Sequence, residues 1–166
     1  MINCWLEDVA DEHEFISLIH NDLGITLKPN PDQSRSDVHA LMVVGHSPIA
    51  QYVNRYAIQI KHYQELKDSG VNRCWWETVK RAERIGFIPL LAFQTSRQWR
   101  VIVPLRAVTR PIGEPSFEST PRTSDSSMTA WLDLESFCLH VRESVNQSPN
   151  HDFRPTGRIL TNTLEV

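Results

Sequence analysis

The chain has 166 residues, of which 40% are hydrophobic and 22% charged, and its formal net charge is −3 at pH 7. This composition is typical of one soluble globular domain, and the absence of any apolar run of about 18 residues excludes a transmembrane helix. The three cysteines are scattered, which excludes a disulfide framework and a zinc knuckle and suits a reducing compartment. The first eight residues are acidic and carry no basic segment, so we expect a cytoplasmic protein without a secretory signal.

Charge is unevenly distributed along the chain. Residues 1–27 carry six acids and no Lys or Arg, whereas residues 55–110 carry eleven Lys and Arg against four acids. A basic segment inside an acidic protein is typical of a binding site for a polyanion. The alternative is a solvated surface that is merely uneven, because charges that cluster in the sequence need not cluster in space.

The hydrophobic pattern predicts alternating helices and strands. Tyr56, Ile58 and Ile60 alternate with less apolar residues, as in a strand with one buried face. Gly24 and Gly86 follow apolar helical stripes as stop signals, and Asp133 is a good N-cap. In chain order we predict a helix over 8–22, strands over 25–28, 37–44 and 55–61, a loop over 46–51, a helix over 75–85, strands over 87–93 and 99–103, a late edge strand over 128–132 and a helix over 134–145.

This order (α-β-β-β-α-β-β, then a C-terminal helix) predicts one α/β domain with a mixed central sheet flanked by helices. We expect residues 1–107 to form the core and residues 128–146 to pack on it. Residues 108–127 and 147–166 are polar and contain proline, so they are predicted to be an exposed loop and a flexible tail.

Common catalytic motifs are absent from the sequence. It has no Gly-rich phosphate loop, which argues against a nucleotide cofactor, and no HExxH, paired CxxC or GxSxG motif. What remains is Asp37 at the start of one predicted strand and Gln59 with Lys61 on the next. Side chains two apart on a strand share a face, and oxygen ligands beside an ammonium group suit metal-assisted phosphodiester hydrolysis. The alternative is that Gln59 and Lys61 are ordinary polar residues of a surface strand and have no catalytic role.

Five stretches in this order resemble the PD-(D/E)xK nuclease superfamily, most closely the small phage and prophage endonucleases related to Holliday junction resolvases. They are residues 23–37, 56–61 (Tyr-Ala-Ile-Gln-Ile-Lys), 75–76 (Trp-Trp), 88–93 and 99–104. The resemblance spans about residues 8–145 and lies in the ordered combination, since no single stretch is specific. It implies a restriction-endonuclease-like fold with a helix–strand–strand–strand–helix–strand core.

The resemblance also implies an active site. Asp37 matches the metal-binding aspartate and Lys61 the active-site lysine, while Gln59 stands where the family usually has Glu or Asp. The carbonyl of Ile60 completes the implied ligands for Mg²⁺, for which Mn²⁺ would substitute. Glu12 on the first helix matches an extra acidic ligand of the resolvase-like branch. Glu14 is the other possibility for that ligand, and an interaction of Glu12 with the helix dipole is the structural alternative.

Further residues are candidates for binding DNA. The cations would contact the phosphate backbone and Trp75 or its neighbour Trp76 would stack on a base. For each cation the alternative is a solvated surface position, and for the tryptophans it is the core. The candidates are Gln33, Arg35, Trp75, Lys80, Arg81, Arg97 and Arg100.

Three functions are compatible with the sequence. The first is a Mg²⁺-dependent endonuclease that cuts branched or junction DNA as a homodimer and leaves 5′-phosphate ends, in which Lys61 assists the attacking water. The second is a DNA-binding protein with an inactive site, because the neutral Gln59 weakens metal binding. The third is a regulatory protein whose basic segment contacts another protein.

Overall fold

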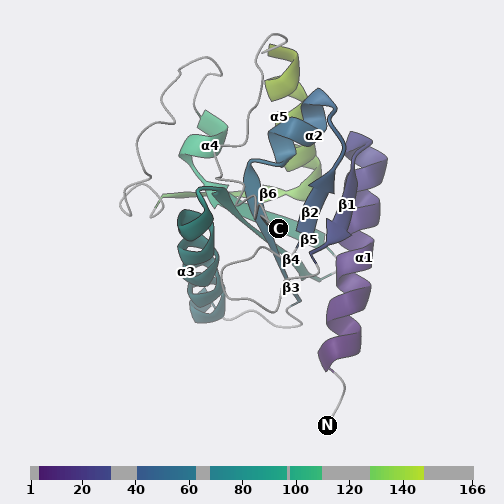
Figure 1. Ribbon diagram of the computed structural model, residues 1–166. Helices are drawn as coiled ribbons and strands as arrows, with labels where there is room; N and C mark the ends of the chain where they lie inside the picture. Colours follow the sequence, from purple (N-terminus) through teal and green to yellow (C-terminus); the bar gives the residue numbers. More distant parts are fainter. Residues whose placement is uncertain (1–3, 31–40, 63–67, 97, 110–127, 148–166) are drawn as a thin grey trace, which may run out of the picture.

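One mixed six-stranded sheet forms the centre of the computed structural model, which describes residues 4–30, 41–62, 68–96, 98–109 and 128–147 (Figure 1). The strands follow one another across the sheet in chain order. They are β1 (Thr26–Pro29), β2 (Leu41–Val44), β3 (Tyr56–His62), β4 (Ile88–Thr95), β5 (Gln98–Pro104) and β6 (Thr129–Asp133). The helices are α1 (Cys4–Leu23), α2 (Pro48–Val53), α3 (Asp68–Ile85), α4 (Arg106–Thr109) and α5 (Leu134–Gln147).

The strand pairing divides the sheet into two antiparallel parts. Adjacent strands are antiparallel within each part: β1 with β2 and β2 with β3, then β4 with β5 and β5 with β6. β3 and β4 are parallel and join the two parts, with Gln59 opposite Leu91 and Lys61 opposite Phe93. Parallel neighbours need a crossover connection, and α3 lies within that connection.

Helices cover both faces of the sheet, and each covered face has its own core. Figure 1 shows α3 on one side and α1 on the other. On the first face, here called the α1 face, α1, α2 and α5 bury a large core that includes Phe15, Ile58 and Phe137. On the opposite face, the α3 face, Trp75 and Val79 are part of a smaller core. The rest of that core is Val71, Leu91, Phe93 and Ile102.

Alternation along each strand fixes which residues belong to which face. On β3, Tyr56 and Ile58 belong to the core of the α1 face. Gln59 is therefore turned to the α3 face, as its parallel partner Leu91 is. Lys61, two residues further along, lies on the same face of the sheet as Gln59.

The α/β class and the mixed sheet agree with the sequence prediction, but the predicted element order is incomplete. Two short helices, α2 and α4, interrupt it. The predicted loop over 46–51 is wrong because Ser47 caps α2: its Oγ accepts a hydrogen bond from the Ala50 amide at 3.1 Å, and Pro48 occupies the first turn. α1 and α3 also begin earlier than predicted, at Cys4 and Asp68.

Several local signals are confirmed. The late strand is β6, at the edge of the sheet, and Asp133 Oδ1 accepts a hydrogen bond from the Ser136 amide at 2.7 Å at the start of α5. Gly24 and Gly86 follow α1 and α3 with φ of 67° and 73°, a conformation that favours glycine after a helix. The predicted loop over 108–127 lies outside the described residues from 110 onward, and of the predicted tail only residue 147 lies within them.

A half-buried histidine joins α5 to α2. The hydroxyl oxygens of Tyr52 and Ser144 lie 3.2 and 3.4 Å from His140 Nε2 and donate to it when that nitrogen carries no proton. Burial lowers the pKa of His140, and a hydrogen bond with the Ala107 backbone and the charge of Glu143 only partly oppose this. The fold therefore favours the neutral ring.

This preference predicts a loss of stability in mild acid. The unfolded chain protonates His140 near its ordinary pKa of about 6.5, while the folded chain resists protonation until a lower pH. The contribution is complete above pH 6.5 and falls as the pH drops through 6.5 toward the lower folded pKa. Urea unfolding between about pH 7.5 and 5 should show a flatter pH dependence for His140→Gln than for the parent protein. His13→Gln, at an exposed position, is the control, and an unchanged pH slope in His140→Gln would contradict the prediction.

Candidate functional site

Gln59 and Lys61 lie in the second half of β3, on the α3 face. Gln59 is buried, at 7% exposure, although its side chain is polar, and Lys61 is exposed. The pairing of β2 with β3 is described at one position, Leu41 with Ile58. The residues just before Leu41 lie outside the described ranges, so the described sheet partners of Gln59 and Lys61 are Leu91 and Phe93 on β4.

Lys61 begins a row of side chains that crosses the α3 face. The strand registers place Phe93, Arg100 and Asp133 in this row on β4, β5 and β6. With neighbouring strands about 4.8 Å apart, Lys61 and Arg100 lie about 10 Å from each other along the row. The Arg100 Nη2 donates to Gln98 Oε1 at 3.3 Å. Two hydrogen bonds with Ser136 and, more weakly, the charge of Arg100 lower the pKa of Asp133.

The acids of α1 lie across the sheet from Gln59 and Lys61. Glu14 Oε2 accepts a hydrogen bond from Gln94 Nε2 at 3.1 Å, near the end of β4. Glu12 is one turn of helix from Phe15, which packs in the core of the α1 face. The structure therefore does not place Glu12 on the sheet face that Lys61 occupies.

Sequence reasoning overlooked Asp11 as a candidate. It is the buried acid of the described part of α1, at 9% exposure, and it lies one turn before Phe15 on the sheet-facing side. The sequence signal that could have identified Asp11 is its spacing of four residues from Phe15, an apolar residue of the core. Glu12 is half-buried and Glu14 is exposed, so neither acid named from the sequence is the one that the fold buries.

Four predicted site residues lie outside the described residues: Gln33, Arg35, Asp37 and Arg97. For Asp37 the sequence supplies one constraint. It precedes Leu41 by four residues, a span of at most about 14 Å in an extended chain, and Leu41 pairs with Ile58 beside Gln59.

The described residues supply only part of a metal site. Within these ranges no three His, Cys, Asp or Glu side chains are grouped in a way that could hold a metal ion. Gln59 Oε1 and the Ile60 carbonyl are hard oxygen donors of the kind that Mg²⁺ prefers, but both are neutral. A site here fits Mg²⁺ only with an anionic ligand from outside the described ranges, which is the role that the sequence prediction gives to Asp37.

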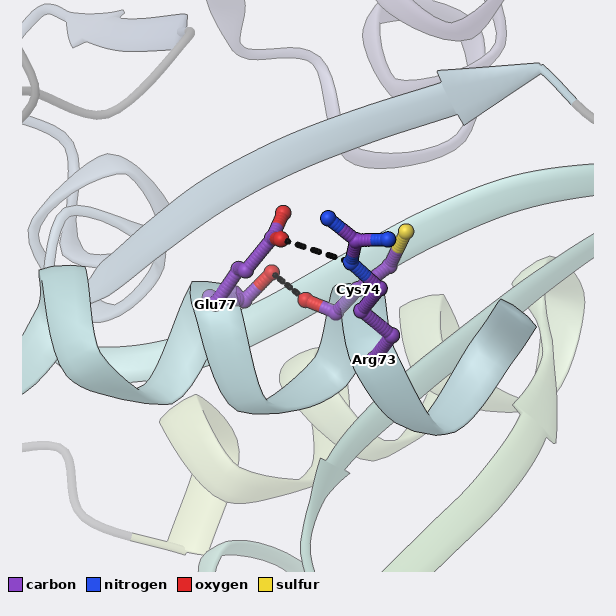
Figure 2. Close-up of polar contacts among 4 residues, drawn as sticks. Arg73, Cys74 and Glu77 are labelled. Atoms are coloured by element: carbon purple, nitrogen blue, oxygen red, sulfur yellow. Dashed lines mark hydrogen bonds and ion pairs between the residues drawn. The ribbon is translucent and has the colours of Figure 1, made fainter. Parts of the chain in front are cut away.

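The predicted cations of α3 lie on its outer side or its flank. Lys80 is exposed and Arg81 is half-buried. Figure 2 shows Arg73 Nε donating to Glu77 Oε1 at 3.4 Å, an exposed pair one turn apart, next to the backbone of Cys74. Exposed pairs of this kind contribute little stability, so Arg73 remains accessible to an anionic ligand.

Trp75 is a core residue, which corrects its predicted role in stacking on a base. It is 4% exposed and is part of the core of the α3 face with Leu91, Phe93 and Ile102. Its ring has no open side for a base to stack on. Trp76, the next residue, is turned about 100° around the helix and is 42% exposed.

Thiol chemistry is not supported at Cys138. Its side chain is fully buried and burial, the largest cause, raises its pKa to about 12. A thiol that stays protonated at neutral pH is a poor nucleophile and a poor metal ligand. Cys138 therefore acts as a small apolar residue in the core.

Together these observations define an α/β protein with one mixed six-stranded sheet, helices on both faces, and a polar pair on the central strand β3. Comparisons with known protein families, with curated proteins and with solved structures gave no match. None of the described helices has the length and apolar character needed to span a membrane.

Proposed function

We propose that this protein is a Mg²⁺-dependent DNA endonuclease with a restriction-endonuclease-like fold. The observation that carries the proposal is the placement of Gln59 and Lys61 on one face of the central strand β3, the face that α3 covers. The buried amide of Gln59 and the exposed ammonium group of Lys61 then lie two residues apart on the same side of the strand, and a phosphodiester can reach Lys61 from solvent.

The order of the elements supports the same proposal. α1, β1, β2, β3, α3 and β4 follow the helix–strand–strand–strand–helix–strand order that the resemblance implies, with the short α2 inserted before β3. The basic segment 55–110 contains β3, α3, β4 and β5 and so surrounds this position in the chain. Binding to the phosphate backbone of DNA requires a positively charged environment.

Each residue has a distinct task in the proposed reaction. Lys61 orients the attacking water or stabilises the negative charge that develops on the phosphate. Gln59, the Ile60 carbonyl and Asp37 would hold Mg²⁺. Glu12, the further acid that the resemblance implies, lies on α1 across the sheet from Gln59 and Lys61, so it is not included in this proposed ligand set. When bound, the ion lowers the pKa of a water ligand and neutralises phosphate charge. Burial of Gln59 restricts its amide to few orientations, which suits a ligand better than a mobile surface side chain.

The neutral side chain of Gln59 supports a second candidate function, a DNA-binding protein that does not cut DNA. Replacing a carboxylate by an amide removes one negative charge from the implied ligand set, and hydrogen bonds involving charged groups are roughly twice as strong as neutral ones. A protein that binds DNA without cutting it is therefore the alternative to an active nuclease. Selectivity for junctions, cutting by a homodimer and substitution of Mn²⁺ for Mg²⁺ belong to the proposal through the resemblance.

The test is cleavage of a labelled four-way junction and of a linear duplex with the same arms, with Mg²⁺ and with an EDTA control. We expect metal-dependent cutting that favours the junction. Equal cutting of both substrates would contradict the junction selectivity alone. A junction that is bound but never cut would support the DNA-binding alternative.

Gln59→Glu is predicted to increase cleavage at low Mg²⁺ concentration. The new carboxylate restores an anionic ligand on a side chain of nearly the same size, so the half-saturating Mg²⁺ concentration should fall by about 10-fold or more, the equivalent of one charge-assisted bond. Gln98→Glu adds the same charge at an exposed position on β5 and should leave the Mg²⁺ dependence unchanged. A lack of response to Gln59→Glu, from a baseline without activity, would indicate a binding protein.

A further inference from the structure

Among the tryptophans whose side chains the structure describes, two are exposed, and both lie on the α3 side of the sheet. Trp131 on β6 is 55% exposed and Trp76 on α3 is 42% exposed, whereas Trp75 and Trp99 are buried. Large aromatic side chains contribute most to a fold when they are buried, so two indoles with about half of their surface exposed point to a binding surface.

Trp131 is held in place from one side. Its ring stands edge-to-face with Phe93, with centroids 5.9 Å apart and an interplanar angle of 82°. Phe93 is itself fully buried in the core of the α3 face, so it provides a rigid support. An indole fixed in this way loses little side-chain entropy when a planar ligand stacks on its free surface.

Trp76 belongs to a stripe of cations on the outer side of α3. Arg73 precedes it by three residues, and Lys80 and Arg84 follow it by four and eight, so all four positions lie on one side of the helix. All four are exposed. Two acids lie beside these positions: Glu77, which is paired with Arg73, and the half-buried Glu83, seven residues after Trp76. An aromatic ring between accessible cations matches a ligand that combines flat rings with negative charge.

Both tryptophans lie on the side of the sheet that carries Gln59 and Lys61. The strand registers place Gln59, Leu91, Ile102 and Trp131 in one row across β3, β4, β5 and β6. Three strand separations put Trp131 about 14 Å from Gln59. Leu91 and Ile102 in this row are buried in the core of the α3 face, so the row gives the distance between the two sites and is not itself a path for the strand.

We propose that the outer side of α3 and Trp131, on β6 of the sheet face that α3 covers, bind single-stranded DNA, with unpaired bases stacking on Trp76 and Trp131 and phosphates contacting Lys80 and Arg84. Stacking on exposed aromatic rings next to cations is a general means of binding a single strand without sequence preference, and it is not available to bases inside a duplex. This inference rests on the proposed function and specifies its substrate as DNA with an unpaired segment.

The test measures binding without catalysis, by fluorescence anisotropy of a labelled 12-nucleotide oligo-dT and of a 12-base-pair duplex, in EDTA. The parent protein is expected to bind the single strand more tightly. Trp131→Ala and Trp76→Ala should each weaken single-strand binding by about 10-fold and change duplex binding little. Leu139→Ala, at an exposed apolar position on α5, is the matched control and should bind normally.

Salt dependence tests the phosphate contacts separately. Lys80→Ala and Arg84→Ala should each reduce the slope of log affinity against log salt concentration by about 0.7 on a single strand. Trp131→Phe should recover part of the lost affinity, because it restores a stacking ring, and thermal unfolding of each variant verifies that the fold is retained.

Three results would overturn the inference: equal affinity for single strand and duplex, unchanged affinity in both tryptophan variants, or a change in self-association in Trp131→Ala, measured by sedimentation, with oligo-dT binding unchanged. The last result would assign Trp131 to contact with a second copy of the chain. Metal-dependent cutting of DNA together with any of these would leave the nuclease proposal standing. Stacking on both tryptophans without any cutting would remove the nuclease proposal alone.

Discussion

Lys61→Ala is expected to reduce Mg²⁺-dependent cleavage of junction DNA by about 100-fold or more. Loss of a single preorganised group that stabilises transition-state charge costs about 10²- to 10³-fold in other hydrolytic enzymes. Lys61 is exposed, so its removal leaves the core intact. Binding of uncut DNA should fall far less, since Lys61 is one of many cations in the basic segment.

The measurement is single-turnover cleavage at saturating protein, which separates the chemical step from binding. Lys28→Ala is the matched control. Lys28 is an exposed lysine on β1 of the same sheet, and β1 runs in the same direction as β3. Equal loss of activity in both variants would indicate a general charge effect, and full activity in Lys61→Ala would remove this residue from the reaction.

Phe137→Ala is expected to lower the free energy of unfolding by about 3 to 5 kcal/mol. Phe137 is 1% exposed on α5 and meets Tyr56 of β3 edge-to-face, with ring centroids 5.7 Å apart. Truncation removes this aromatic contact and leaves a cavity between the helix and the sheet. Since domains of this size are stable by about 5 to 15 kcal/mol, the variant should be close to unfolding.

Urea unfolding followed by circular dichroism provides the measurement. Leu139→Ala changes the same helix two residues later at a side chain that is 50% exposed, and it should cost less than about 1 kcal/mol. Similar losses in the two variants would mean that α5 does not dock on the sheet through Phe137.

The two proposed activities occupy different parts of one side of the molecule. Gln59 and Lys61 lie on β3, and the two exposed tryptophans lie on α3 and on β6. A branched substrate offers both a phosphodiester and unpaired bases, so one substrate can satisfy both. The acids Glu12 and Glu14 lie on the other side of the sheet, which keeps their negative charge away from the stripe of cations on α3.

Local patterns predicted most elements of this protein. Alternation in Tyr56, Ile58 and Ile60 predicted β3, and Asp133 predicted the start of α5, because both signals depend on residues a few positions apart. The Ser47-Pro48 start of α2 was also local, but the helix it begins has only six residues and carries no apolar periodicity long enough to detect.

Other features depended on contacts between distant segments. Trp75 and Trp76 are equivalent in the sequence, and only the docking of α3 on Leu91, Phe93 and Ile102 decides which one is buried. Likewise, Asp11, Glu12 and Glu14 are similar acids until the rotation of α1 against the sheet buries the first.

The sequence by itself determined the α/β class, the order of the main elements, and the presence of Gln59 and Lys61 on one face of a strand, because strand alternation is a property of the backbone. The tertiary structure alone decided that β3 and β4 are parallel neighbours, that α1 lies across the sheet from this pair, and that Trp76 and Trp131 remain exposed. These features arise from packing between segments far apart in the chain, and the burial of a residue is set by its partners rather than by its own type.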